Sequence, residues 1–242
     1  MLTLAALGWL LAAMGMATLW AWQEFPWING LRMATALRRS DATSTGAGPS
    51  SRSILTDAAW NALVSALAIV DANVGGGAWA RRSTIAWMMG SWGARLVVQL
   101  LYAPPVFREP DRQRDNAPSF WFLQAKAASA LFFSLPALLA SVNPDPNLAS
   151  VELAACGLWI VGFAGETTAD RQLLRFTSNP ANAGLACRAG LWRYSRNATA
   201  VFEEIIWIAY ALFAFASPWG SIAFACPAVM AYRLVTRKRS TH

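Results

Sequence analysis

Long apolar runs separated by short basic segments constrain the fold of this chain more than any other feature. Most of the runs approach the roughly 20 residues that a helix needs to cross the hydrocarbon core of a bilayer. Of the 242 residues only 14% are charged, whereas soluble globular domains have about 25%. We therefore expect an all-α integral membrane protein.

The runs predict about seven transmembrane helices, in a single membrane domain that covers residues 1–242. The first run lacks the leading basic residues of a cleaved signal peptide, so we expect it to be retained as a helix. Proline and glycine end the runs or make turns between them, as in the turn Asn143-Pro-Asp-Pro-Asn147 and at Pro218 and Gly220. The expected helices are 1–22, 54–74, 83–103, 119–142, 149–168, 198–216 and 221–234.

Arginine and lysine are divided unevenly between the expected loops. Loops on one side carry almost all of them, including segment 23–53, which is rich in serine, threonine and glycine and is expected to be a flexible cytoplasmic loop. The loops on the other side carry only Arg81 and Arg82. Because cytoplasmic loops are enriched in basic residues, the bias predicts an outside N-terminus and a cytoplasmic C-terminus. It also accounts for the net charge of +7 without a nucleic-acid partner.

The histidine and cysteine residues give no indication of a metal site. The single histidine is His242, and Cys156, Cys187 and Cys226 form no CxxC pair. Protein zinc sites need clustered histidine and cysteine ligands. We therefore expect no bound metal.

Ionisable residues also occur inside or at the ends of the expected helices, where a charge normally faces the interior of the bundle. They are Asp57, Asp71, Arg95, Lys126, Glu152, Glu166, Glu203 and Glu204. Asp71, Glu152 and Glu204 lie near helix ends, from which a side chain can reach the membrane surface. Arg95 and Lys126 lie deeper, so we expect them to be paired within the bundle.

A group of acidic and basic residues follows the fifth expected helix. Glu166 and Asp170 are four residues apart and would share one helix face. The arginines that follow are Arg171, Arg175, Arg188, Arg193 and Arg196. Arginine binds phosphates and carboxylates accept ribose hydroxyls, so segment 166–203 is a candidate site for a phosphorylated, ribose-bearing cofactor. On spacing alone, a basic loop that meets anionic lipid headgroups is an equal alternative. The chain has no glycine-rich phosphate loop, so any nucleotide site is not Rossmann-like.

The same segment carries a series of motifs in a fixed order. They are Gly162-Phe163, Glu166-x-x-x-Asp170-x-Gln172, Arg175-Phe176, Asn179-Pro180-Ala181-Asn182, Gly190-Leu191-Trp192-Arg193-Tyr194-Ser195-Arg196, Glu203 and Trp207. Further motifs begin at Ser53, Trp92 and Ser134. Through these residues the chain resembles the steroid 5α-reductase superfamily, especially its bacterial branch of uncharacterised membrane proteins, over roughly residues 53–215.

The resemblance implies a seven-helix oxidoreductase that acts on CH–CH groups. NADPH would lie in a cavity open to the cytoplasm and would reduce a polarised carbon–carbon double bond of a lipid or steroid-like substrate. By position in the motifs, the implied cofactor contacts are Asp170, Arg175, Asn182, Arg196 and Glu203. The superfamily places substrate-polarising acids on its early helices, which makes Asp57 the implied catalytic residue.

The chain departs from the superfamily between Asn197 and Phe202. The usual His-Pro-x-Tyr motif is absent there, and Phe202 replaces a glycine. This departure, together with 13 tryptophans that suit membrane interfaces and helix contacts, supports an alternative. The chain would then be a non-catalytic structural or accessory subunit with membrane-protein partners. A methyltransferase of the isoprenylcysteine type, which binds S-adenosylmethionine, is a third interpretation.

Overall fold

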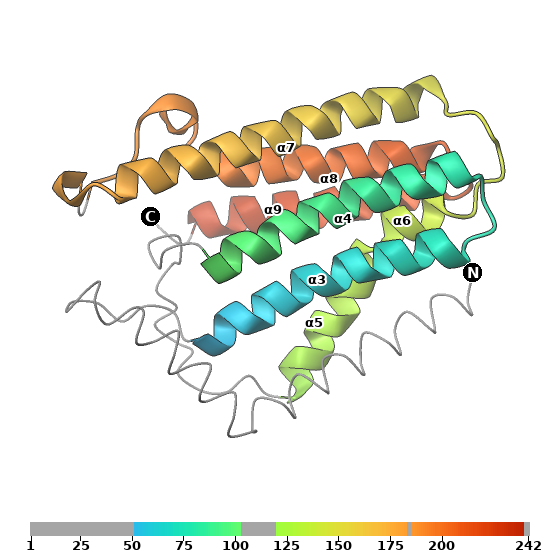
Figure 1. Cartoon of the computed structure of the whole chain (residues 1–242), viewed down its shortest axis with the longest axis horizontal. Coiled ribbons are helices and arrows are strands. Elements are labelled where there is room, and N and C mark those ends of the chain that lie inside the picture. The colour runs from blue at the N-terminus through green and yellow to red at the C-terminus, as the bar shows by residue number, and fades with distance from the viewer. Residues whose placement is uncertain (1–50, 103–119, 183–184, 240–242) are drawn as a thin grey trace. The chain divides into compact units, whose positions relative to one another are not determined.

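The computed structural model describes residues 51–102, 120–182 and 185–239. Within these ranges the chain is all-α, without strands, as the sequence predicts. The α-helices are α3 Ser51–Val74, α4 Trp79–Tyr102, α5 Phe120–Phe133, α6 Leu135–Ala140, α7 Ser150–Thr177, α8 Ala198–Phe215 and α9 Ala225–Arg239 (Figure 1). The 3₁₀ helices are η2 Pro180–Asn182, η3 Gly190–Arg193 and η4 Gly220–Phe224.

The observed helices lie where the apolar runs predict them, from the second expected helix to the last. Three predicted helices differ in detail. The fourth is divided into α5 and α6, α7 continues to Thr177 beyond the predicted end at residue 168, and the last begins as η4 and continues as α9 to Arg239. Among the described residues, the helical stretches Phe120–Ala140 and Ala198–Phe215 are long and apolar enough to cross a membrane. The predicted helix 1–22 and nearly all of the predicted loop 23–53 lie outside the described residues, and α3 begins at the end of that loop.

The chain divides into two compact units. The first is Met1–Leu67 with Gly93–Phe132, and the second is Ala68–Trp92 with Phe133–His242. In the first unit, Trp60 Nε1 of α3 donates a hydrogen bond of 2.9 Å to Ser129 Oγ of α5. Gly93 of α4 lies so close to α3 that an added Cβ would be 3.2 Å from the carbonyl oxygen of Asn61. The first unit is therefore held by close helix contacts and by polar side chains between helices.

In the second unit, α7 and α8 run side by side in opposite directions (Figure 1). Gly162 near the middle of α7 meets Ile206, and a Cβ at position 162 would lie 2.7 Å from Ile206 Cγ1. Farther along α7, Asp170 meets Thr199, close to the start of α8. Small residues on α7 therefore let the two backbones approach closely, which positions the polar residues farther along both helices.

A cluster of aromatic side chains fills the core of the second unit beside α8. Trp92, Phe133, Trp207 and Tyr210 are all buried. The ring centroid of Trp207 lies 5.4 Å from those of Trp92 and Tyr210 and 4.7 Å from that of Phe133. The Tyr210 hydroxyl donates a hydrogen bond of 3.2 Å to the carbonyl oxygen of Met88. Edge-on ring contacts of this kind stabilise packing beyond the area that they bury.

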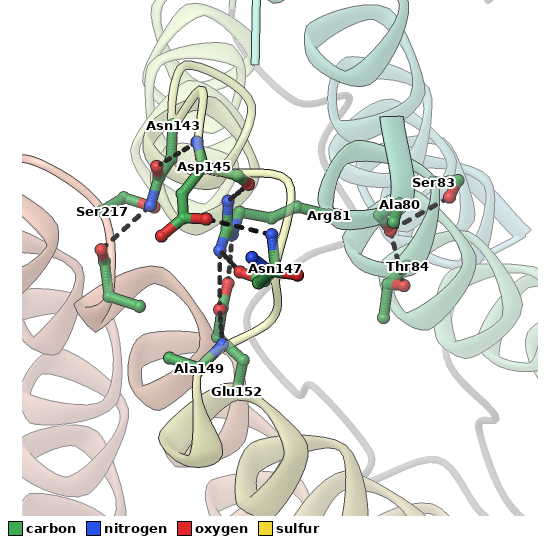
Figure 2. Close-up of polar contacts among 11 residues, drawn as sticks. Ala80, Arg81, Ser83, Thr84, Asn143, Asp145, Asn147, Ala149, Glu152 and Ser217 are labelled. Carbon is green, nitrogen blue, oxygen red and sulfur yellow. Dashed lines mark hydrogen bonds and ion pairs between the residues drawn. The ribbon is translucent and has the colours of Figure 1, made fainter. Parts of the chain in front are cut away.

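A buried ion pair joins the start of α4 to the start of α7 (Figure 2). The guanidinium of Arg81 pairs with the carboxylate of Glu152, and the two side chains are 2% and 0% exposed. Arg81 also donates to the carbonyl oxygens of Asp145 at 2.5 Å and Asn147 at 2.7 Å. Glu152 accepts a further bond of 2.7 Å from the N–H of Ala149. We call these five residues the Arg81–Glu152 cluster.

The loop from Asn143 to Asn147 supports this cluster. Asn143 Oδ1 accepts from the N–H of Asp145 at 3.1 Å, and Asp145 Oδ1 accepts from the N–H of Asn147 at 3.0 Å. The Asn143 amide also donates to the carbonyl oxygen of Ala216, at 2.9 Å, near the end of α8. Asn143 and Asp145 each begin an Asx turn and are each followed by a proline, and together they form the turn that the sequence predicts. The Asn143 amide joins this turn to the end of α8, where Ser217 lies beside it (Figure 2).

Candidate functional site

The interface between α7 and α8 contains three of the acidic residues that the sequence singles out, namely Glu166, Asp170 and Glu203. Asp170 is buried, and its Oδ1 accepts a hydrogen bond of 3.0 Å from Thr199 Oγ1. Glu166 lies one turn earlier on the same face of α7 and is also buried. Glu203 is half-buried one turn after Thr199 on α8. The packing of these two helices therefore places acidic residues on facing surfaces, which we call the acidic layer.

The connection between α7 and α8 folds back against α7. The N–H of Leu191 donates a hydrogen bond of 2.8 Å to Gln172 Oε1, and Trp192 Nε1 donates one of 2.9 Å to the carbonyl oxygen of Ala169. Both acceptors lie in the last part of α7, which extends beyond its predicted end. These two bonds hold η3 against the part of α7 that lies beyond the predicted end.

Gly190 and Asn182 have structural roles in this connection, the first through its backbone conformation and the second through a hydrogen bond. Gly190 has a φ of 57°, in the left-handed region, and an added Cβ would lie 2.5 Å from Gln172 Cδ. Glycine is the residue that adopts this conformation without strain. Asn182, an implied cofactor contact, donates its amide to the carbonyl oxygen of Phe176 at 2.8 Å. Its amide therefore also holds η2 to the end of α7.

The arginines near this end of α7 are all exposed. They are Arg171, Arg175, Arg188, Arg193 and Arg196. Arg175 lies on the outer side of α7, away from the face that carries Asp170. Arg196 precedes α8 in the connection, and Arg193 stacks on the ring of Tyr194 at 5.2 Å. Exposed guanidinium groups suit phosphate binding, since their donors are open to an incoming anion.

Asp57, the implied catalytic residue, belongs to the first unit, whereas the implied cofactor contacts belong to the second. Its carboxylate forms an ion pair with Lys126, and the Asp57 side chain is 51% exposed. The prediction that Lys126 is paired is therefore confirmed. The Nζ of Lys126 also lies 5.9 Å from the ring centroids of Trp60 and Phe122. Because the ammonium is the donor of this pair, Lys126 is better suited than Asp57 to donate a hydrogen bond to a carbonyl oxygen.

Phe202 packs between the two helices next to the acidic layer. Its ring lies against α7 at Gly165, where an added Cβ would overlap the ring atoms. Gly165 directly precedes Glu166 in the chain. Phe202 is thus a structural contact between α7 and α8, and it fills space beside the candidate cofactor contacts.

The structure adds polar residues that the sequence does not assign to a site. Thr199 lies inside the stretch that departs from the superfamily, so its pairing with Asp170 has no motif to indicate it. Gln172 belongs to the motif Glu166-x-x-x-Asp170-x-Gln172, so the sequence could have indicated that it has a role, here its contact with η3. Glu152 is fully buried and paired instead of reaching the membrane surface. Its hydrogen bond with Arg81 raises the pKa of the guanidinium above its ordinary value, so Arg81 remains charged.

The described part of the chain contains no group of three or more histidine, cysteine, aspartate or glutamate residues that could hold a metal ion. A model of a protein family, described as a protein of unknown function (DUF1295), matches residues 49–240. The matched region includes every described helix. No curated protein and no solved structure gives a significant match to the chain.

Proposed function

Since the chain belongs to the family described as protein of unknown function (DUF1295), we propose that it is a membrane-embedded, NADPH-dependent reductase. The substrate would be a lipid or steroid-like molecule with a polarised carbon–carbon double bond. The proposal starts from the resemblance to the steroid 5α-reductase superfamily. One observation carries it further, namely that the acidic layer and a set of exposed arginines occur at the same end of the α7–α8 pair.

The residues at this end have the chemistry that a dinucleotide phosphate needs. Arg196 is exposed and would bind a phosphate group through charge-assisted hydrogen bonds. The carboxylates of Asp170 and Glu203, with the amide of Asn182, would accept or donate hydrogen bonds at the ribose and nicotinamide. When bound, NADPH would supply the hydride. The protein would orient the substrate and polarise its carbonyl oxygen, for which Asp57 and its partner Lys126 are the candidates.

NADPH binding to Arg196→Ala tests this proposal. We expect the purified parent chain in detergent to bind NADPH with micromolar affinity, measured by quenching of the cofactor fluorescence. Arg196→Ala should weaken binding by about tenfold or more, because a hydrogen bond to a charged group contributes about 1.5–3 kcal/mol. Arg188→Ala is the matched control, since Arg188 is equally exposed but belongs to no implied contact. A parent chain that does not bind NADPH would rule the proposal out.

We also propose the membrane topology that the loop charges predict. Seven helices would cross a bacterial inner membrane, with the N-terminus outside and the C-terminus in the cytoplasm. Two of the described helical stretches support membrane insertion by their length and apolar composition. In this topology the exposed arginines of the connection between α7 and α8 would face the cytoplasm, where NADPH is available.

A second candidate function, a non-catalytic structural or accessory subunit, is favoured by the position of Phe202. Its ring fills the space at Gly165, next to the acidic layer. Asp170 and Asn182 are also engaged in bonds within the protein. Under this proposal the polar residues stabilise the α7–α8 pair, and the membrane-protein partners bind elsewhere on the chain.

Phe202→Gly distinguishes the two functions. If the chain is an accessory subunit, the variant should lose packing at Gly165 and lower the midpoint of thermal unfolding, without gaining NADPH binding. The parent chain, extracted in mild detergent, should also purify with other membrane proteins at fixed stoichiometry. Tighter NADPH binding by Phe202→Gly than by the parent chain would contradict the accessory function, because the ring would then have been blocking a cofactor site.

A further inference from the structure

The outer face of α7 carries a continuous stripe of exposed residues. From the start of the helix the stripe is uncharged, and beyond Thr168 it becomes basic. Its members are Ser150, Leu153, Ala154, Gly157, Ile160, Val161, Ala164, Thr168, Arg171 and Arg175. They recur at spacings of three and four, which places them on one side of a helix. We call this set the α7 stripe.

The apolar part of the α7 stripe is unusually exposed for large side chains. Leu153, Ile160 and Val161 are 59%, 60% and 57% exposed. At 1.5 Å per residue, the distance along the helix from Ser150 to Thr168 is about 27 Å, close to the ~30 Å thickness of a bilayer hydrocarbon core. The stripe therefore has the length and the composition of a lipid-facing surface.

The acidic residues of α7 all lie away from this surface. Glu152, Glu166 and Asp170 are buried on the opposite side of the helix. Glu152 is paired with Arg81, and Asp170 accepts from Thr199. These three acidic residues lower the mean hydropathy of α7, although none of them would contact lipid. The outer surface of α7 is therefore more apolar than the sequence of the whole helix indicates.

The basic end of the stripe has no exposed acidic residue near it in the described sequence. Between Ser150 and Thr236, every described aspartate and glutamate is buried or half-buried. Arg171 and Arg175 continue the apolar stripe by one and two helical turns, so they would lie just beyond the hydrocarbon core. Anionic headgroups attract basic residues at this depth, and the guanidinium group binds phosphate through paired donors.

We propose that the α7 stripe faces the bilayer and that Arg171 and Arg175 bind the phosphate groups of anionic phospholipids. The apolar part would contact acyl chains, and the two arginines would hold the headgroups at the end of α7. The inference does not depend on cofactor binding, because it concerns the outer side of α7 and not the acidic layer. It gives Arg175 a lipid partner, in place of the cofactor contact that the resemblance implies.

Depth measurements with spin labels test the first part of this proposal. In a background with Cys156, Cys187 and Cys226 replaced, single cysteines would be introduced in place of Ile160, Arg171 or the buried Ala155 and labelled in phosphatidylcholine nanodiscs. Oxygen, which concentrates in acyl chains, should relax the label at Ile160 most. A water-soluble nickel chelate should relax the label at Arg171 most, and Ala155→Cys should be protected from both reagents.

The outcomes separate lipid from the other possible environments of the stripe. If the nickel chelate reaches Ile160→Cys as readily as Arg171→Cys, the stripe lies in water and the proposal is wrong. If neither reagent reaches Ile160→Cys, another protein segment covers the stripe, and the proposal is equally wrong.

Lipid selectivity tests the second part. The association of spin-labelled phosphatidylglycerol, relative to labelled phosphatidylcholine, would be measured with the purified chain in phosphatidylcholine bilayers. The double variant Arg171→Gln/Arg175→Gln should lose selectivity for phosphatidylglycerol by on the order of tenfold, because each basic residue near the surface contributes a few-fold. Arg188→Gln/Arg193→Gln removes the same charge away from the stripe and should retain most of the selectivity.

Two results would overturn the assignment of the two arginines. One is equal loss of selectivity in both double variants, which would show a diffuse charge effect. The other is unchanged lipid selectivity in Arg171→Gln/Arg175→Gln together with weaker NADPH binding, which would make a soluble phosphate compound their partner. The NADPH measurement on Arg196→Ala is separate, so failure of the proposed reductase function would leave the lipid result unaffected.

Discussion

Arg81→Met is expected to lower the free energy of unfolding by about 3–5 kcal/mol, the usual effect of removing one partner from a buried ion pair. The variant would leave the buried carboxylate of Glu152 without its counter-charge. It would also remove the donors that satisfy the carbonyl oxygens of Asp145 and Asn147. The loss should appear as a lower midpoint of thermal unfolding in detergent, followed by tryptophan fluorescence.

The double variant Arg81→Met/Glu152→Leu is the decisive control. It leaves no unpaired charge in the cluster, so its stability should exceed that of Arg81→Met alone. A cycle of the parent chain, both single variants and the double variant gives the coupling energy directly. Additive losses in this cycle would mean that Arg81 and Glu152 do not act as a pair.

Arg82→Met provides a matched comparison at the adjacent position. Arg82 is half-buried, and its Nη1 donates to the carbonyl oxygens of Ala72 and Gly75 at 2.8 Å. No carboxylate depends on these bonds, so the loss should be about 1 kcal/mol per hydrogen bond. If Arg82→Met lowered the free energy of unfolding as much as Arg81→Met does, the stabilisation would come from any positive charge at this turn and not from the Arg81–Glu152 ion pair.

The same substitution at two glycines of α7 is expected to have opposite effects on stability. Gly157→Ala should stabilise the protein by about 0.5–1 kcal/mol, because alanine is the better helix former and an added Cβ meets no atom within 4 Å. Gly162→Ala should destabilise it by about 1–3 kcal/mol, since the added Cβ would press on Ile206 at the α7–α8 interface. Thermal unfolding in detergent would measure both changes.

The signs of the two changes matter more than their sizes. Both residues lie in the interior of one helix, so differences in helix propensity cancel between them. If Gly162→Ala were as stable as Gly157→Ala, α8 would not approach α7 as closely as the structure has it. Gly162→Ala should cost less in an Ile206→Ala background than in the parent chain, because that substitution removes the Cγ1 that the added Cβ would meet.

Much of the fold follows from the apolar runs. The starts and ends of α3, α4 and α8 lie within a few residues of the predicted ones, because long apolar segments and the breaks between them are strong local signals. The turn at Asn143–Asn147 is also predicted locally, from prolines and Asx residues. The end of α7 is different, since Asp170, Arg171 and Gln172 interrupt the apolar run, yet the helix continues to Thr177 and contacts η3 at Ala169 and Gln172.

The contacts of the candidate site were harder to predict. A spacing of four puts Glu166 and Asp170 on one face of α7, and both are buried. The same spacing gives no information about which residue of α8 they meet, so Thr199 and Phe202 could not be identified as neighbours. Arg81 and Glu152 are 71 positions apart, and no periodic pattern relates residues at that distance. The sequence indicated which residues are polar within apolar segments, but not their partners.

The Arg81–Glu152 cluster also has a consequence for the order of assembly. During synthesis the start of α4 leaves the ribosome before the start of α7. Arg81 therefore has no ion-pair partner in the cluster until Glu152 has been synthesised. The pair can form only after the loop around Asn147 and the first turn of α7 are in place. Closure of the cluster therefore cannot precede synthesis of the first turn of α7, and a chain truncated before Glu152 would lack the carboxylate partner of Arg81.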